Sequence, residues 1–228
     1  MRAGAILKLA LGSSKPALVP QLYTHAVRAK IETEIKLAVR DLPELRRRLR
    51  ALGARYDGRV FEQNTVYDTP EGGFRRLGRL VRLRIETSGG RHTARLTSKA
   101  PTERVHKSAG RHKQRFESEA EVADPNKTAA MLGTIGLRPS FRYEKFRTTY
   151  RLEGLELDLD ETPVGTFLEL EGRPGDIDRV ARELGYRPNG YIRGTYWDVY
   201  AADCRRRGRK PTNMVFAHKN PRKRTLSA

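Results

Sequence analysis

Charged side chains that could bind metal ions or phosphate recur at every second position in several segments of this chain. Glu32, Glu34 and Lys36 alternate with apolar residues near the start, and Asp158 and Asp160 do the same later on. Carboxylate oxygens are the ligands that Mg²⁺ and Mn²⁺ prefer. Arginine and lysine are the usual partners of phosphoryl oxygens. The first chemistry that these residues suggest is binding of a polyanion together with a divalent metal ion.

Alternation with a period of two is typical of a β-strand that buries one face. Eight segments show it, and we expect strands over residues 31–39, 60–68, 79–86, 91–99, 112–122, 145–152, 155–160 and 166–171. Helical spacing predicts amphipathic helices over residues 41–54, 124–136, 175–186 and 191–207, with Asp41 as the N-cap of the first. The pattern favours an antiparallel β body whose apolar face is covered by helices.

The charges on the polar strand faces are sorted by sign. If consecutive strands are neighbours, the third and fourth bring basic residues together and the seventh and eighth bring acidic residues together: Arg82, Arg84 and Lys99, and Asp158, Asp160, Glu169 and Glu171. Like charges opposite each other cost roughly 0.2–1 kcal/mol. An ordinary sheet with its charged face in water explains any single strand, but not this sorting.

A closed barrel gives the sorted charges a use. A barrel of about eight strands has room for one small ligand. A charged interior is costly to fold unless water, ions or a ligand occupy it. We therefore predict a mainly β protein with flanking helices: an eight-stranded antiparallel β-barrel or tunnel, with a charged lumen and amphipathic helices packed outside.

The excess of positive charge belongs mostly to the two ends. The chain of 228 residues has 46 Lys plus Arg and 27 Asp plus Glu, but residues 1–31 and 205–228 contain no acid. We expect a basic disordered extension at 1–30, the folded domain at 31–204, and a basic, solvated tail at 205–228 that could attract polyanions without specificity. A general nucleic-acid-binding role loses support, because the middle of the chain is nearly balanced. A single cysteine excludes a disulfide framework within the chain. Because of this sole thiol, and because export and membrane signals are missing, we expect a cytoplasmic location.

Seven motifs in order resemble the CYTH domain proteins, also called triphosphate tunnel metalloenzymes. The family's ExExK is similar to Glu32-x-Glu34-x-Lys36. The other motifs are VYDTP (66–70), RLVRLRIE (79–86), LTSK (96–99), RFESE (115–119), KFR (145–147) and LDLDETPVGTFLELEG (157–172). The resemblance covers roughly residues 31–200. Thr166 departs from it, because members often have Asp after the glycine.

The resemblance implies a set of site residues. The implied ligands of a divalent metal, Mg²⁺ or Mn²⁺, are Glu32, Glu34, Asp158, Glu169 and Glu171. The implied triphosphate cradle is Lys36, Arg82, Arg84, Lys99, Arg115, Lys145 and Arg147, and Lys36, Arg84 and Glu34 are the residues expected to act in catalysis. Glu117, Glu119 and Asp160 are implied only as ligands of a second metal or as residues that orient the basic side chains.

The resemblance also implies a metal-dependent enzyme that acts on inorganic triphosphate, thiamine triphosphate or ATP. Such an enzyme would either hydrolyse its substrate or cyclise ATP to cyclic AMP, as a class IV adenylate cyclase does, and it could form a homodimer. The alternative is a polyphosphate- or nucleotide-binding module without turnover. A P-loop is absent, because GGFRRLGRL (72–80) lacks the Lys-Ser/Thr pair and is better interpreted as a turn that enters a strand. We expect Tyr196 and Trp197 to anchor the core or an interface rather than to stack on a base.

Overall fold

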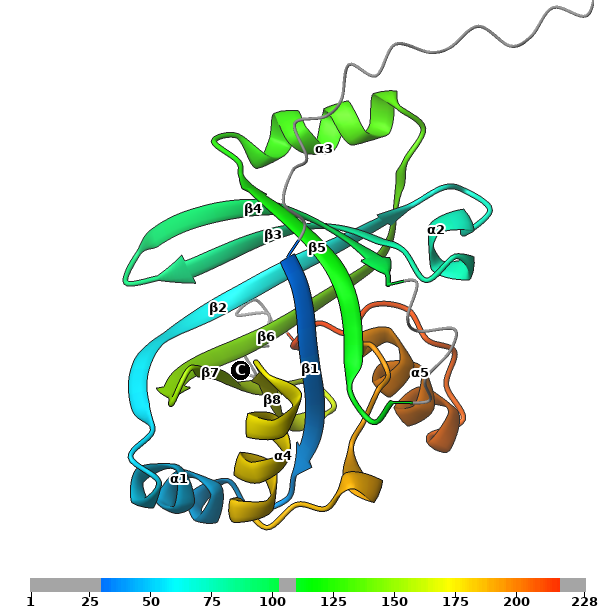
Figure 1. Cartoon of the computed structure of the whole chain (residues 1–228). Coiled ribbons are helices and arrows are strands. Elements are labelled where there is room, and N and C mark those ends of the chain that lie inside the picture. Colours follow the sequence, from blue (N-terminus) through cyan, green and yellow to red (C-terminus); the bar gives the residue numbers. More distant parts are fainter. Residues whose placement is uncertain (1–29, 103–109, 218–228) are drawn as a thin grey trace, which may run out of the picture.

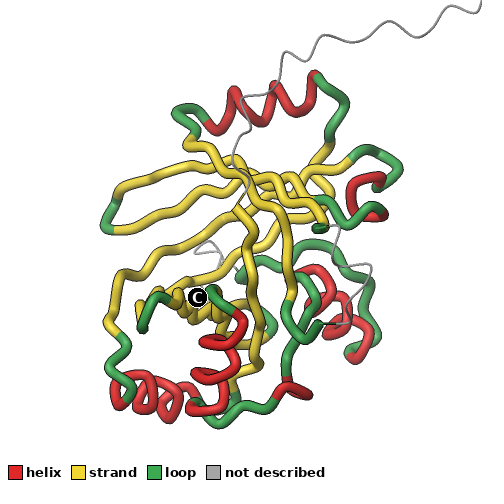
Figure 2. Tube along the Cα trace, viewed as in Figure 1, coloured by secondary structure: helices red, strands yellow, loops and turns green. Residues whose placement is uncertain are grey.

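The structure is a computed structural model that describes residues 30–102 and 110–217. It contains eight strands: β1 (Lys30–Val39), β2 (Arg55–Asp68), β3 (Leu80–Ser88), β4 (Arg91–Pro101), β5 (Lys113–Glu121), β6 (Arg138–Leu152), β7 (Leu155–Thr162) and β8 (Gly165–Glu171). They close into one antiparallel barrel in the order β1-β5-β4-β3-β2-β6-β7-β8 (Figures 1 and 2). The predicted fold is confirmed. The extension at 1–29 and the end of the tail, from residue 218, lie outside the described residues.

Two strands begin earlier than the alternation indicates. β2 starts at Arg55 and β6 at Arg138, and the two strands pair along almost their whole length, with register shifts between Tyr56 and Gly58 and between Val66 and Tyr67. In the early parts of these strands, apolar and polar residues alternate poorly. Pairing with a partner strand, rather than a local sequence pattern, therefore keeps them extended. This long β2–β6 pair forms one wall of the barrel.

The helices follow the predicted positions. They are α1 (Leu42–Ala51), α3 (Pro125–Thr134), α4 (Pro174–Glu183) and α5 (Tyr196–Arg206), with a short α2 (Gly73–Arg76) and a 3₁₀ turn, η2 (Pro188–Gly190), that the pattern did not indicate. Asp41 caps α1 as expected, because its carboxylate accepts a hydrogen bond from the backbone N–H of Glu44 at 2.9 Å. The helix ends before Gly53, whose φ of +77° reverses the chain.

The main apolar core lies outside the barrel. Leucines from β7 and β8, such as Leu157 and Leu168, pack with Leu49 of α1 and with Ile177 and Val180 of α4, and all five are 0% exposed. Figure 1 shows α1 and α4 together beneath this side of the barrel, while α3 lies over β3 and β4. Burial of this outer face stabilises the fold, and it leaves the inner face of each strand free for polar residues.

The chain after β8 does more than cover the outside. The first turn of α5 places Tyr196 inside the barrel, where its hydroxyl donates a hydrogen bond to Asp160 at 2.5 Å. Further on, Met214 forms a parallel bridge with Tyr143 of β6 and is only 1% exposed. The first part of the segment expected to be a solvated tail therefore packs against β6.

No helix within the described ranges is long and apolar enough to cross a membrane.

Candidate active site

One cavity of about 540 Å³ runs into the barrel. Its wall contains all five residues implied as ligands of the first metal and all seven of the implied triphosphate cradle: Glu32, Glu34, Lys36, Arg82, Arg84, Lys99, Arg115, Lys145, Arg147, Asp158, Glu169 and Glu171. They come from seven of the eight strands, so the period-two alternation brings them to one inner face. The structure thus brings the predicted site residues together.

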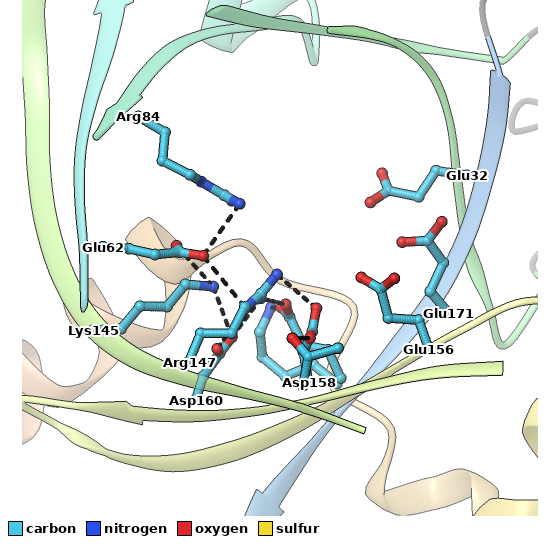
Figure 3. A network of polar contacts seen from close by, with 12 residues as sticks. Glu32, Glu62, Arg84, Lys145, Arg147, Glu156, Asp158, Asp160 and Glu171 are labelled. Carbon is cyan, nitrogen blue, oxygen red and sulfur yellow. Dashed lines mark hydrogen bonds and ion pairs between the residues drawn. The ribbon is translucent and has the colours of Figure 1, made fainter. Parts of the chain in front are cut away.

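Carboxylates form a row across three neighbouring strands. Glu34 of β1 lies opposite Glu171 of β8, and Glu171 lies opposite Glu156 of β7. Figure 3 shows Glu156 and Glu171 on one side of the lumen with Glu32 beside them. Such a row is unfavourable without cations. Two of its three neutralising partners lie at the surface: Lys30, 2.6 Å from Glu171, and the half-exposed Arg151, 2.5 Å from Glu156.

Glu156 was missing from the implied metal ligands, although the alternation in residues 155–160 already placed it on the same face as Asp158.

Arg147 occupies a cage of carboxylates on the neighbouring strands. Its guanidinium contacts Asp158 at 2.6 Å and Asp160 at 2.7 and 2.8 Å, and it also donates a hydrogen bond to Glu169. Burial, together with Asp160 and Glu156, raises the pKa of Asp158 to about 7 despite the attraction of Arg147. The prediction that acidic and basic residues are separated along the barrel is therefore wrong at this point, because the basic strand β6 lies directly beside the acidic strand β7.

The remaining cations near the acidic row are paired in the same way. Lys99 contacts Glu32 at 2.6 Å, Lys113 contacts Glu34 at 2.6 Å, and Lys36 contacts Glu169 at 3.0 Å. Burial disfavours the charged form of Glu34, but Lys113 and the lysines around it lower its pKa to about 2. Glu34 is therefore a carboxylate throughout the physiological range.

Glu62 is a buried acid that the sequence analysis missed. It is 0% exposed and contacts Arg84 at 3.1 Å and Lys145 at 3.5 Å, as Figure 3 shows. Burial opposes its ionisation, but Arg84 and Lys145 lower the pKa of Glu62 far below its usual value. The signal was present, because alternation in residues 60–68 places Glu62 on the inner face of β2. Glu62 positions two cations of the cradle.

Three acids were implied only as second-metal ligands or as residues that orient basic side chains, and none of them borders the cavity. Glu117 contacts Lys99 at 3.0 Å, and Glu119 accepts a hydrogen bond from Thr97 at 2.6 Å. Asp160 binds Lys145 at 2.7 Å as well as Arg147. Their contacts are those of residues that orient the basic set.

The chemistry of the donors around the acidic row fits a hard divalent cation, because carboxylate oxygens from adjacent strands face one cavity. Within residues 30–102 and 110–217, however, no three His, Cys, Asp or Glu side chains converge closely enough to hold a metal ion. Each implied ligand instead accepts a hydrogen bond or an ion pair from a cation in this structure. A bound metal ion would have to replace those partners.

The chain was compared with known proteins. The CYTH domain model matches residues 30–196. A protein of Pyrococcus horikoshii OT3 is 25% identical, with a TM-score of 0.62 over 74% of this chain and 97% of that one. A candidate adenylate cyclase from Vibrio parahaemolyticus is 15% identical, with a TM-score of 0.64 over 75% and 98%.

A candidate adenylyl cyclase from Hippeastrum, described as having a dominant triphosphatase activity, is 21% identical, with a TM-score of 0.54 over 79% of this chain and 97% of that one. No curated protein matches. At these identities the Vibrio and Hippeastrum structures support the fold alone. The family model spans most of the chain, and the chain belongs to the CYTH domain family.

Proposed function

We propose that this protein is a divalent-metal-dependent enzyme that binds a triphosphate in its tunnel and either hydrolyses it or, with ATP, cyclises it to cyclic AMP. The observation that supports this most directly is that carboxylates and cations line a single cavity and neutralise one another in pairs. A metal ion and a triphosphate together could exchange partners with these pairs without leaving a buried charge uncompensated.

The cations of the tunnel are suited to the phosphate chain. Arg82 and Arg84, both under 10% exposed, can each offer two N–H groups to phosphoryl oxygens, and Lys36 and Lys145 offer point charges. Their positions are fixed before substrate arrives, since Glu62 holds Arg84 and Asp160 holds Lys145. Charge stabilisation by groups already in place is the main contribution that a protein makes to phosphoryl transfer.

The carboxylates of the acidic row, with Glu32, Asp158 and Glu169, are the residues that would hold the metal ion. Bound there, Mg²⁺ or Mn²⁺ would neutralise charge on the phosphate chain and activate it towards a nucleophile. Hydrolysis and cyclisation need the same cradle and differ in the attacking oxygen, water in one case and the 3′-hydroxyl of ATP in the other.

The test is product formation by the full-length protein with inorganic triphosphate, thiamine triphosphate and ATP, each with Mg²⁺, Mn²⁺ or EDTA. Free phosphate identifies a hydrolase, and cyclic AMP with pyrophosphate identifies a cyclase. We expect Glu34→Gln and Arg84→Ala each to reduce kcat/KM by 100-fold or more, because both remove a charge that faces the substrate site. Retention of full activity in both variants would refute the site assignment.

A second candidate is a binding module without turnover, which would keep each implied metal ligand paired with its present cation. It predicts tight, salt-sensitive binding of polyphosphate and no metal-dependent product. Removal of residues 218–228, which contain four of the basic residues of the tail, should then weaken binding sharply. An enzyme of small triphosphates should keep its turnover after the same truncation. A cytoplasmic location and a homodimer stay predictions of the sequence.

A further inference from the structure

The cavity wall changes character at the end formed by α2 and the first turn of α5. Trp197 lines the wall there, with Phe141 of β6 and Pro70 near it, in contrast to the charged residues of the rest of the lumen. Along β6, Phe141 lies at the opposite end from the residues that pair with the acidic row, because Arg151 is opposite Glu156. This mouth of the tunnel therefore combines aromatic residues with charged ones, among them Asp68, Glu71 and Asp198, whereas the acidic row lies towards the other end of β6.

Trp197 is held as a fixed platform. A capping box between Thr195 and Asp198 secures the start of α5: the Asp198 carboxylate accepts from the Thr195 N–H at 2.7 Å. The indole packs against Phe141 in a T-shaped contact, with ring centroids 5.1 Å apart and planes at 80°. This contact supports the side chain, and the indole also borders the cavity.

A flat cation already lies over the Trp197 ring. The guanidinium of Arg75, an exposed residue of α2, is 5.4 Å from the centroid of the Trp197 ring. α2 is a single turn between Gly72 and Gly78, both with positive φ. Because the Arg75 side chain is exposed and long, it can move aside or close over a ring that stacks on Trp197.

The cations at this mouth differ from those deeper in the tunnel. Among the residues that the structure describes, Arg75, Arg79 and Arg115 line the cavity without an ion pair to a carboxylate, whereas the lysines of the lumen and Arg82, Arg84 and Arg147 all have one. Arg115 lies opposite Pro101 on β4, next to Gly78. Arg115 also lies opposite Glu32 of β1, so of these three arginines Arg75 is the one in contact with the Trp197 ring.

We propose that Trp197, covered by Arg75, is a binding subsite for a flat aromatic heterocycle attached to the triphosphate, and so determines a preference for organic over inorganic triphosphates. The inference rests on the proposed function for the position of the phosphates. The cavity volume, about 540 Å³, lies within the roughly 300–1,000 Å³ typical of sites for larger organic ligands. Trp197 also packs against the aromatic core cluster of Phe141 and Tyr196, as the sequence analysis expected, and the proposal adds a ligand contact to that role.

The chain offers a direct probe, because Trp197 is its only tryptophan. The full-length protein with Mg²⁺ is titrated with adenosine 5′-(β,γ-imido)triphosphate and, separately, with inorganic imidotriphosphate, and tryptophan fluorescence is recorded. We expect the nucleotide analogue to change the emission strongly and to bind about tenfold more tightly, as stacking on one aromatic ring allows. Equal affinities and identical spectral changes would overturn the proposal.

A kinetic comparison tests the same subsite. For Trp197→Ala, the ratio of kcat/KM for ATP to kcat/KM for inorganic triphosphate should fall about tenfold. A second series of assays replaces ATP with thiamine triphosphate, which carries a cationic heterocycle. Trp197→Phe should restore most of the ratio, and Tyr56→Ala, which removes an exposed aromatic of β2 outside the cavity wall, should leave it at the wild-type value.

The outcomes separate the two proposals. A ratio that Trp197→Ala leaves unchanged for both organic substrates overturns the subsite while the proposed function stands. If the wild-type protein turns over no triphosphate, the proposed enzyme fails, and the fluorescence titration alone decides whether a heterocycle binds at Trp197. Should Trp197→Ala fail to fold, the titration of the wild-type protein still decides.

Discussion

Replacement of Arg147 by methionine tests whether the charged side chains of the lumen are desolvated and neutralise one another in ion pairs. The change keeps most of the side-chain volume and removes the guanidinium that binds Asp158, Asp160 and Glu169. Asp160 would keep Lys145 and Glu169 would keep Lys36. Asp158 would keep only the hydrogen bond from Thr149, at 2.6 Å. One buried carboxylate is therefore left without a counterion.

Removal of one partner from a buried ion pair costs about 3–5 kcal/mol, because the remaining charge stays desolvated. In a protein of this size that corresponds to a fall in Tm of about 6–20 °C. The assay is urea unfolding of the metal-free protein, followed by circular dichroism at pH 9, where Asp158, with a pKa of about 7, is a carboxylate in the wild-type protein.

Arg151→Met is the matched control. Its guanidinium also pairs with two acids, Asp57 and Glu156, but 47% of the side chain is exposed, so we expect a loss below about 1 kcal/mol. Equal unfolding midpoints for the two variants would refute the reasoning, since Asp158 would then be as well solvated as a surface acid.

Three further predictions concern other parts of the chain. Hydrogen bonds from Arg47 and Arg48 lower the pKa of Glu44 to about 2, so this group stabilises the fold above its unfolded pKa near 4.3 and the contribution is lost as the pH falls towards 2. Glu44→Gln should lose less stability than the wild type between pH 5 and pH 2, and a carboxyl NMR titration of Glu44 with a midpoint near 4.3 would count against the contact. Met214→Ala should lower the free energy of unfolding in urea by about 2–5 kcal/mol, because the side chain is 1% exposed. Val215→Ala, at 39% exposure, should lower it by less than about 1 kcal/mol. Similar losses in the two variants would mean that this segment is not docked on β6. Finally, Mg²⁺ and inorganic triphosphate together should raise Tm by more than the sum of their separate effects, because each alone leaves one set of tunnel charges without partners, and a strictly additive thermal shift would contradict the exchange of partners.

The barrel could be predicted from the sequence because its inner face is polar and its outer face is apolar. That difference imposes a strict alternation on segments such as residues 31–37 and 155–160. The same alternation correctly placed Glu34, Asp158 and Glu169 on one inner surface. Turn residues such as Glu153-Gly154, both with positive φ, marked the tight connection between β6 and β7.

The pairing of distant strands was beyond the local pattern. β2 neighbours β6, although three strands separate them in the chain. This places Glu62 against Lys145, and β7 on the other side of β6 places Asp160 against Arg147. The ion pairs that balance the lumen depend on these neighbours, so charge sorting read along single hairpins overestimated the separation of signs.

Helical periodicity also left the role of α5 open. It indicates which residues share a face of the helix, but not that the first turn reaches into a barrel. Tyr196 therefore looked like a core residue, and it is indeed buried, yet its hydroxyl binds Asp160 in the lumen. Trp197, one position later, lines the cavity. The unpatterned turn of α2 that brings Arg75 over this ring had no signal in the sequence beyond its glycines.

The central claim is that the inner carboxylates bind a divalent metal ion and the inner cations bind a triphosphate in the same cavity. The most direct test is a crystal structure of the full-length protein with Mn²⁺ and inorganic imidotriphosphate, with the metal located by its anomalous scattering. The account predicts an Mn²⁺ ion ligated by at least two carboxylates among Glu32, Glu34, Glu169 and Glu171, with phosphate oxygens on Arg82 and Arg84. Triphosphate bound only on the outer surface, with the ion pairs of the lumen intact, would contradict it.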